Sequence, residues 1–306
     1  MAFSIPTSPT EQLSGSSLGT LAGLTAAVIW GAYLSFSRAG VAAGLDGVDV
    51  AFLRYVVAGP VMLMLLLARQ GPLRLGMRVG QATTVALLLG PLFVLLSVGG
   101  YAYAPLEHGA VILPATLTLG GLLLARVVLG EQLGLGQIIG AAVIVAGLML
   151  VAGPGILYGG MTSLIGDAMF LAAGFLWSIF GTVQQRWRLA AFDVVTVVSV
   201  AGLLAVVPAY LILRGTEVIL SVPVSVLAVQ VLVQGLLSGV IAMITYAKAI
   251  SLLGAARAAT FPALVPGFAL LIGIPLVNEL PTGIQIGGLA LVAIGLAVVL
   301  ARKVSA

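Results

Sequence analysis

The chain has 306 residues, of which 61% are hydrophobic and only 7% are charged. Soluble domains carry about 25% charged residues, so this composition excludes a water-soluble fold for most of the chain. The sequence contains no cysteine and one histidine, His108, so disulfides and thiolate metal sites are excluded and we expect no metal and no cofactor. We attribute the pI of about 9.7 to orientation in a membrane, and expect no nucleic-acid partner.

Ten apolar stretches follow one another along the chain, each near the ~20 residues that a helix needs to cross a bilayer. They cover 18–39, 49–68, 81–102, 107–127, 134–153, 164–186, 193–213, 225–247, 256–276 and 283–301. Residues 1–17 form a polar cytoplasmic segment without the basic region or cleavage site of a signal peptide, and 302–306 form a cytoplasmic tail. The sequence therefore predicts an all-α multi-pass membrane protein in contact with the lipid bilayer.

The basic residues predict the orientation of these spans. If the amino terminus is cytoplasmic, ten Lys and Arg lie in the inside loops and tail, and only Arg38 and Arg214 lie outside. Such an excess of inside charge fixes both termini in the cytoplasm, as expected for a bacterial inner-membrane protein.

The second half of the chain repeats the first. At an offset of 148, Pro114, Glu131, Gln137 and Gly147 coincide with Pro262, Glu279, Gln285 and Gly295, and at an offset of 147 Trp30 coincides with Trp177. Two five-span units, 18–153 and 164–301, follow from this match. Because five is odd, the second unit must be inverted, and inverted repeats are typical of secondary transporters with a central site.

The residues also resemble a known family. The "WG" pair of the first span, Arg54 in the second, and a proline in the fourth followed by "LGEQLGLGQIIGAAVIVAG" are similar to the EamA family of the drug/metabolite transporter superfamily. This resemblance implies ten helices around a central cavity and a transport function. The stretch "LEHGAVILPATLTL" resembles amino-acid exporters of the YddG type. The second repeat departs from the pattern, since it has no counterpart of Arg54 and has Asn278 in place of a glycine before Glu279.

The first helices of the two repeats present matching faces. Trp30, Tyr33 and Ser37 share one face of the first span, and their mates Trp177, Phe180 and Gln184 share one face of the sixth. A mid-membrane indole N–H needs a partner, which a wet cavity or a solute carboxylate would supply. We predict that all six residues contact the solute, although packing between helices is the alternative for the tryptophans.

Two prolines and two tyrosines complete the predicted binding site. Pro114 and Pro262 interrupt corresponding helices, and interrupted helices in matched positions point to a transporter site, although each proline could instead only kink its helix. Tyr101 and Tyr246 lie near span ends, where they either line a vestibule or belong to the interfacial aromatic belt.

Four titratable residues are candidates for gating or proton coupling. They are Asp167, Glu107, His108 and Arg54. Asp167 could instead cap its helix, and Arg54 could point outward to the interface or pair with a carboxylate such as Glu107. We interpret Glu131 and Glu279 as caps of the hairpin turns, and the G-x-x-x-G pairs at 136/140, 235/239 and 283/287 as packing faces within a monomer or a homodimer.

No acidic or basic residue is expected at the middle of any span, so we predict a cavity without fixed charge. Such a cavity suits export of neutral amino acids, aromatic ones included, or similar amphipathic metabolites by facilitated transport or exchange. A proton-coupled drug or metabolite efflux carrier is the alternative. An intramembrane aspartyl protease is a weaker one, because "LIGD" at 164–167 only partly matches the protease motif and lacks a second aspartate at mid-depth.

Overall fold

The computed structural model describes residues 9–68, 75–153, 160–277, 280 and 282–301. In these residues ten helical spans are long and apolar enough to cross a membrane, which confirms the predicted all-α membrane fold. The spans are Gly15–Ser37, Gly47–Ala68, Val79–Ala102, His108–Val128, Leu135–Ala152, Ser163–Trp187, Ala191–Leu213, Val224–Leu253, Ala255–Pro275 and Gly283–Ala301. Most bounds lie within a few residues of the predicted ones, and the eighth span is longer at its carboxyl end.

The first five spans contain one break that the sequence analysis did not predict. They comprise α1 (Pro9–Ala42), α2 (Gly47–Ala68), the pair α3 (Val79–Leu89) and α4 (Pro91–Gly99) with η1 (Gly100–Ala102), α5 (Leu106–Val128) and α6 (Leu135–Ala152). The third span is broken because Pro91 cannot donate a backbone hydrogen bond and its ring clashes with a continuing helix.

The last five spans are irregular at the corresponding place and at one further place, the ninth span. They comprise α7 (Ser163–Trp187), α8 (Ala191–Leu213), the short α9 (Glu217–Ser221), α10 (Val224–Gln230) with η3 (Val231–Ala242) and α11 (Met243–Leu253), α12 (Ala255–Ala258) with η4 (Phe261–Leu264) and α13 (Val265–Val277), and α14 (Gly283–Ala301). The π-helical η3 occupies the place that corresponds to the α3–α4 break. Segments of this kind interrupt regular helices and occur often at functional sites.

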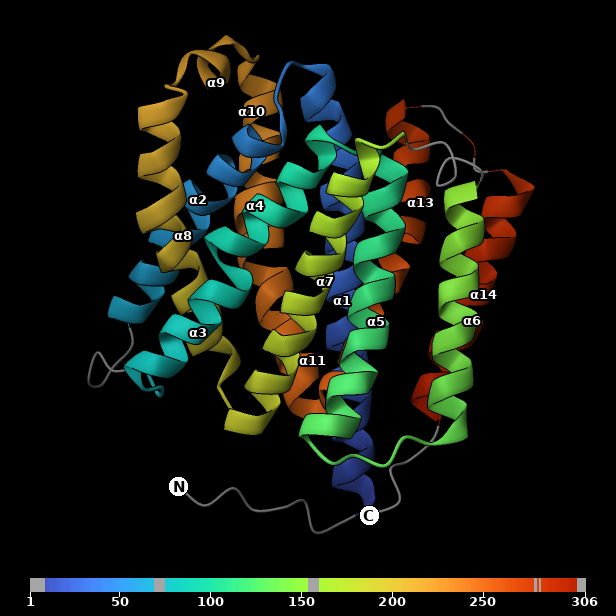
Figure 1. Ribbon diagram of the computed structural model, residues 1–306. Helices are drawn as coiled ribbons and strands as arrows, with labels where there is room; N and C mark the ends of the chain where they lie inside the picture. The colour runs from blue at the N-terminus through green and yellow to red at the C-terminus, as the bar shows by residue number, and fades with distance from the viewer. Residues whose placement is uncertain (1–8, 69–74, 154–159, 278–279, 281, 302–306) are drawn as a thin grey trace.

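The two repeats run through the bundle in opposite directions. Figure 1 shows that α1 begins and α14 ends at one end of the bundle, which we call the basal end, whereas α9 lies at the other, the apical end. Because α7 begins at the apical end and α1 at the basal end, the first helices of the repeats are antiparallel. This is the inverted arrangement that the sequence predicts.

Helices α6 and α14, the last helices of the two repeats, pack on each other at one side of the bundle (Figure 1). A Cβ atom at Gly147 would lie 2.6 Å from the carbonyl oxygen of Gly288, and one at Gly140 would lie 2.7 Å from that of Gly295. Glycines 235 and 239 similarly face Val57 and Ala58 of α2. These small residues therefore allow close approach within one chain, whereas glycines 283 and 287 face open space.

Candidate functional site

Aromatic rings from both repeats meet at the centre of the bundle. The Trp30 and Trp177 rings lie 5.0 Å apart between centroids, in a T-shaped contact. Tyr246 lies 5.2 Å from Trp30 and 5.5 Å from Trp177, and Phe93 lies 5.4 Å from Trp177. The two tryptophans that mark the sequence repeat are thus in direct contact. Among the described residues, the buried indole N–H of Trp177 has no hydrogen-bond partner.

A cavity lies between this aromatic cluster and the apical end. Six of the predicted site residues line it: Trp30, Tyr33, Tyr101, Pro114, Trp177 and Pro262. Tyr101, near the apical end of its span, is 37% exposed. The cavity therefore reaches from mid-bundle toward the apical side.

Four predicted site residues do not line this cavity. Phe180, Gln184 and Tyr246 are each no more than 1% exposed and are packed on the basal side of the cavity or behind the tryptophans. Ser37 donates to the carbonyl of Tyr33 and accepts from Gln234 Nε2, so it joins α1 to η3. Of the three residues predicted on the α7 face, Trp177 alone lines this cavity, whereas Phe180 and Gln184 are buried, so their contact with the solute stays a prediction.

The broken third span supplies cavity residues that the sequence analysis missed. Phe93 and Ser97 of α4 line the wall, as does Tyr55 of α2. The signal for α4 was present in the Gly90-Pro91 dipeptide, since such pairs interrupt regular structure. No sequence signal separates Tyr55 from an ordinary packing residue, because the rotation of α2 is set by its neighbours.

The two repeat-related prolines lie in the cavity wall but affect their helices differently. Pro114 lies inside the continuous helix α5, whereas Pro262 is the second residue of η4, which begins after α12 has ended. Thr118, one turn after Pro114, donates to the carbonyls of both Pro114 and Ala259 and so ties the two proline regions together. The predicted interruption is therefore complete only in the second repeat.

Arg54 lines the cavity and does not point outward to the interface, which was one of the roles considered from the sequence. Its Nη2 approaches the backbone oxygen of Ser238 at 3.4 Å, a weak hydrogen bond. Among the described residues no carboxylate lies within ion-pair distance of Arg54. A basic side chain within a span costs about 2.5–3.5 kcal/mol. The prediction of a cavity without fixed charge is therefore wrong.

Two of the candidate proton-linked residues are paired. His108 Nδ1 of α5 lies 2.7 Å from Asp167 Oδ1 of α7, and the two side chains are 2% and 21% exposed. Asp167 thus contacts another helix, which the cap alternative did not predict. The side chain of Glu107 lies outside the described residues. Because Gly109 and Ala110 directly follow His108 and line the cavity, the pair is adjacent to its wall.

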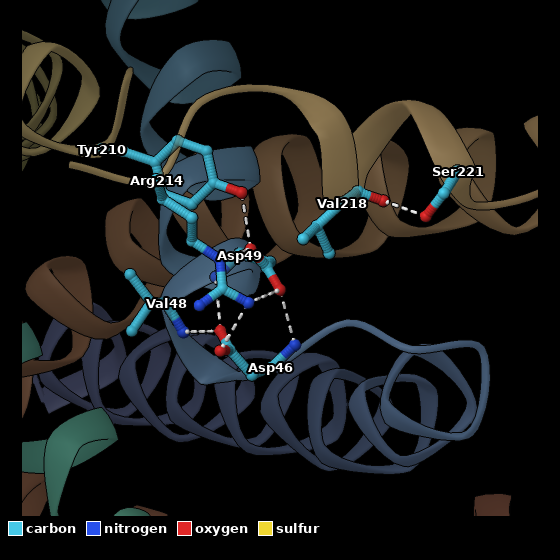
Figure 2. A network of polar contacts seen from close by, with 7 residues as sticks. All are labelled: Asp46, Val48, Asp49, Tyr210, Arg214, Val218 and Ser221. Carbon is cyan, nitrogen blue, oxygen red and sulfur yellow. Dashed lines mark hydrogen bonds and ion pairs between the residues drawn. The ribbon is translucent and has the colours of Figure 1, made fainter. Parts of the chain in front are cut away.

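A charged network at the apical end joins α2 to the end of α8, as Figure 2 shows. Arg214 Nε lies 2.8 Å from the fully buried Asp49, its Nη2 lies 2.7 Å from Asp46, and Tyr210 donates to Asp49. Burial opposes the charge of Arg214, but Asp49 and Asp46 outweigh this effect and raise the pKa of its guanidinium. Arg214 therefore stays charged at every pH at which the protein is used.

The repeated glutamines, rather than the glutamates, cap the last helix of each repeat. Gln137 Oε1 accepts from the amide of Gly134, and Gln285 Oε1 accepts from that of Thr282. Glu131 instead accepts from Gln185 Nε2 at 2.8 Å, and this contact ties the α5–α6 loop to α7. The interpretation of Glu131 as a cap is wrong, and Glu279 lies outside the described residues.

Comparison with known proteins identifies the family. The model of the EamA-like transporter family matches residues 17–153 and, a second time, residues 164–301. The chain belongs to the EamA-like transporter family. Members of this family are transporters of small molecules rather than enzymes, so the EamA match removes the intramembrane protease alternative. The chain is accordingly a multi-pass membrane transporter.

A solved structure supports the fold. One, described only as the crystal structure of a protein, is 20% identical to the EamA chain and aligns with a TM-score of 0.72. The alignment covers 92% of this chain and 96% of that one. Among curated proteins, none matches the chain.

Proposed function

We propose that the protein is an alternating-access carrier that exports neutral amino acids, aromatic ones included, or similar amphipathic metabolites. The apolar and aromatic walls of the cavity suit the body of such a solute, and its few polar groups suit the head. Export, rather than uptake, follows from the resemblance to amino-acid exporters. Both repeats that line the cavity belong to one chain, so a single copy suffices, and a homodimer is not required.

The unequal burial of symmetry-related residues is the observation that most directly supports alternating access. Tyr33 and Leu34 of α1 line the cavity, whereas their mates in α7, Phe180 and Gly181, are buried in the closed basal half. An inverted repeat would exchange these two arrangements by moving the repeats relative to each other, which closes the apical side and opens the basal one. The buried oxygen Oε1 of Gln184, which has no hydrogen-bond partner in the described part of the chain, would gain water or solute in that second state.

The predicted orientation indicates to which side of the membrane the cavity opens. The excess of basic residues favours an orientation in which the basal end faces the cytoplasm across a bacterial inner membrane. The cavity then opens away from the cytoplasm, as it would after releasing an exported solute. With no described acidic residue in the cavity wall, transport is facilitated or by exchange.

Counterflow into liposomes tests the function. We expect purified protein to exchange labelled phenylalanine, leucine or another neutral amino acid against an internal pool, without a pH gradient. If liposomes with the protein exchange none of the twenty amino acids faster than empty liposomes, the proposal is contradicted.

Proton-coupled efflux is a second candidate, favoured by the His108–Asp167 pair beside the cavity wall. Under this alternative, net transport would follow an imposed pH gradient, and Asp167→Asn would abolish that dependence while exchange continued. Transport that is indifferent to the gradient in both proteins would exclude it.

A further inference from the structure

We infer that Arg54 forms a carboxylate-binding subsite, and that the cavity binds amphipathic monocarboxylate anions more tightly than zwitterions or cations. This inference rests on the proposed function. Among the amphipathic metabolites that the proposed function includes, it names those that carry a carboxylate without a compensating ammonium group as the preferred solutes.

The charge balance of the cavity wall is the first argument. Arg54 is half-buried in that wall, and among the described residues it has only the weak contact to Ser238. In a low-dielectric site a guanidinium is stabilised by an anion, and its planar donors match the two oxygens of a carboxylate. The negative charge that would balance Arg54 is therefore best supplied by the solute.

Neighbouring hydroxyls strengthen this end of the cavity as an anion site. Tyr33 and Tyr55 line the same cavity as Arg54. Ser97 of α4 adds a third hydroxyl to the lining. Phenol and serine hydroxyls can donate hydrogen bonds to a carboxylate in addition to the guanidinium.

The lining offers no matching site for an ammonium group. Of the described residues that line the cavity, none is an aspartate or a glutamate. The nearby apical carboxylate, Asp49, is already occupied by Arg214 and Tyr210. An amino acid would therefore bind through its carboxylate but leave its ammonium group without an ionic partner. Removing that group from the solute removes a cost of desolvation.

The remaining wall suits an apolar body. Trp30, Trp177, Phe93 and Leu89 line the part of the cavity next to the aromatic cluster. Aromatic rings gain from edge-to-face contacts as well as from burial of apolar area. An arylalkanoate, with a ring at one end and a carboxylate at the other, satisfies both parts of the cavity.

Three solutes that share one body provide the test. These are 3-phenylpropanoate, L-phenylalanine and 2-phenylethylamine, with net charges of about −1, 0 and +1 at neutral pH.

The intrinsic fluorescence of the protein can report binding of these solutes. The chain has three tryptophans, and only Trp187 lies away from the cavity. Trp187→Phe therefore leaves a protein whose tryptophan fluorescence reports the cavity. Each solute is titrated into the Trp187→Phe protein that keeps Arg54 and into the same protein with Arg54→Gln or Arg54→Lys. Arg78→Gln is the control, because it removes an exposed charge at the basal end.

We expect phenylpropanoate to bind most tightly and phenylethylamine most weakly. Arg54→Gln should weaken phenylpropanoate binding about 30-fold or more, leave phenylethylamine unchanged or slightly improved, and be partly rescued by Arg54→Lys. Arg78→Gln should retain the order of the original protein. If Arg54→Gln does not fold, the order of the three solutes on the Arg54 protein decides the question.

Phenylalanine that binds more tightly than phenylpropanoate, or an Arg54→Gln protein that keeps the anion preference, would overturn the inference. Counterflow distinguishes this from failure of the proposed function. Exchange of phenylalanine that phenylpropanoate does not inhibit overturns the inference alone, whereas no binding and no exchange of any of the three solutes overturns both.

Discussion

Single residues break the symmetry of the two repeats at the apical network. Asp49 is fully buried and is held by Arg214 and Tyr210 (Figure 2), whereas the repeat-related position holds Thr196. Arg214 is also one of the two basic residues on the apical side that run against the charge bias. Its ion pairs explain why it is retained there. The network stabilises the α2–α8 contact rather than forming part of the cavity.

Arg214→Leu should destabilise the protein strongly. Removing one partner of a buried pair costs about 3–5 kcal/mol because the other charge stays buried, and partial exposure of Arg214 places this case toward the lower end. The free energy of unfolding, measured by reversible unfolding in mixed detergent micelles, checks this. Asp46→Asn is the matched control, since asparagine still caps α2 and the Asp46 ion pair is exposed. Equal stability of the two variants would contradict this account.

At the scale of elements, the pairing of α6 with α14 shows how the repeat builds its own interface. Gly140 faces Gly295 and Gly147 faces Gly288, so each glycine contacts the mate of the other. The same sequence, used twice in opposite directions, thus supplies both sides of a close contact. The two helices lie to one side of the cavity and hold the repeats together without lining it.

Gly147→Ala should lower the melting temperature, because its Cβ would lie 2.6 Å from a backbone oxygen that cannot move independently. Overpacking of this kind costs about 1–3 kcal/mol. Gly287→Ala, on the same pair of helices but facing open space, should leave stability unchanged or raise it slightly. Thermal unfolding of both purified variants in one detergent tests the difference, and a Gly287→Ala protein that melts below Gly147→Ala would refute it.

At the scale of the whole molecule, the sequence was sufficient for the number of spans, the repeat and the position of Trp30 and Trp177 in the cavity wall. Each follows from composition, from spacing or from symmetry, which act along the whole chain. The sequence was not sufficient for the burial of Phe180 and Gln184, because a symmetric pattern cannot specify which side of an inverted pair is closed.

The position of Arg54 was missed for a different reason. Depth in the membrane is readable from a sequence, but the rotation of α2 about its axis depends on packing against α8 and η3. That rotation directs Arg54 into the cavity and gives the site its charge.

Side-specific labelling of Leu34→Cys and Gly181→Cys tests alternating access most directly. The natural chain has no cysteine, and these two positions are symmetry mates, one in the cavity wall and the other buried with room for a side chain. We predict that a membrane-impermeant maleimide labels Leu34→Cys from the apical side only. Gly181→Cys should be protected at rest and become reactive from the basal side during exchange of a transported solute. Labelling of both cysteines from the same side, or a Gly181→Cys that never reacts while exchange proceeds, would contradict the account.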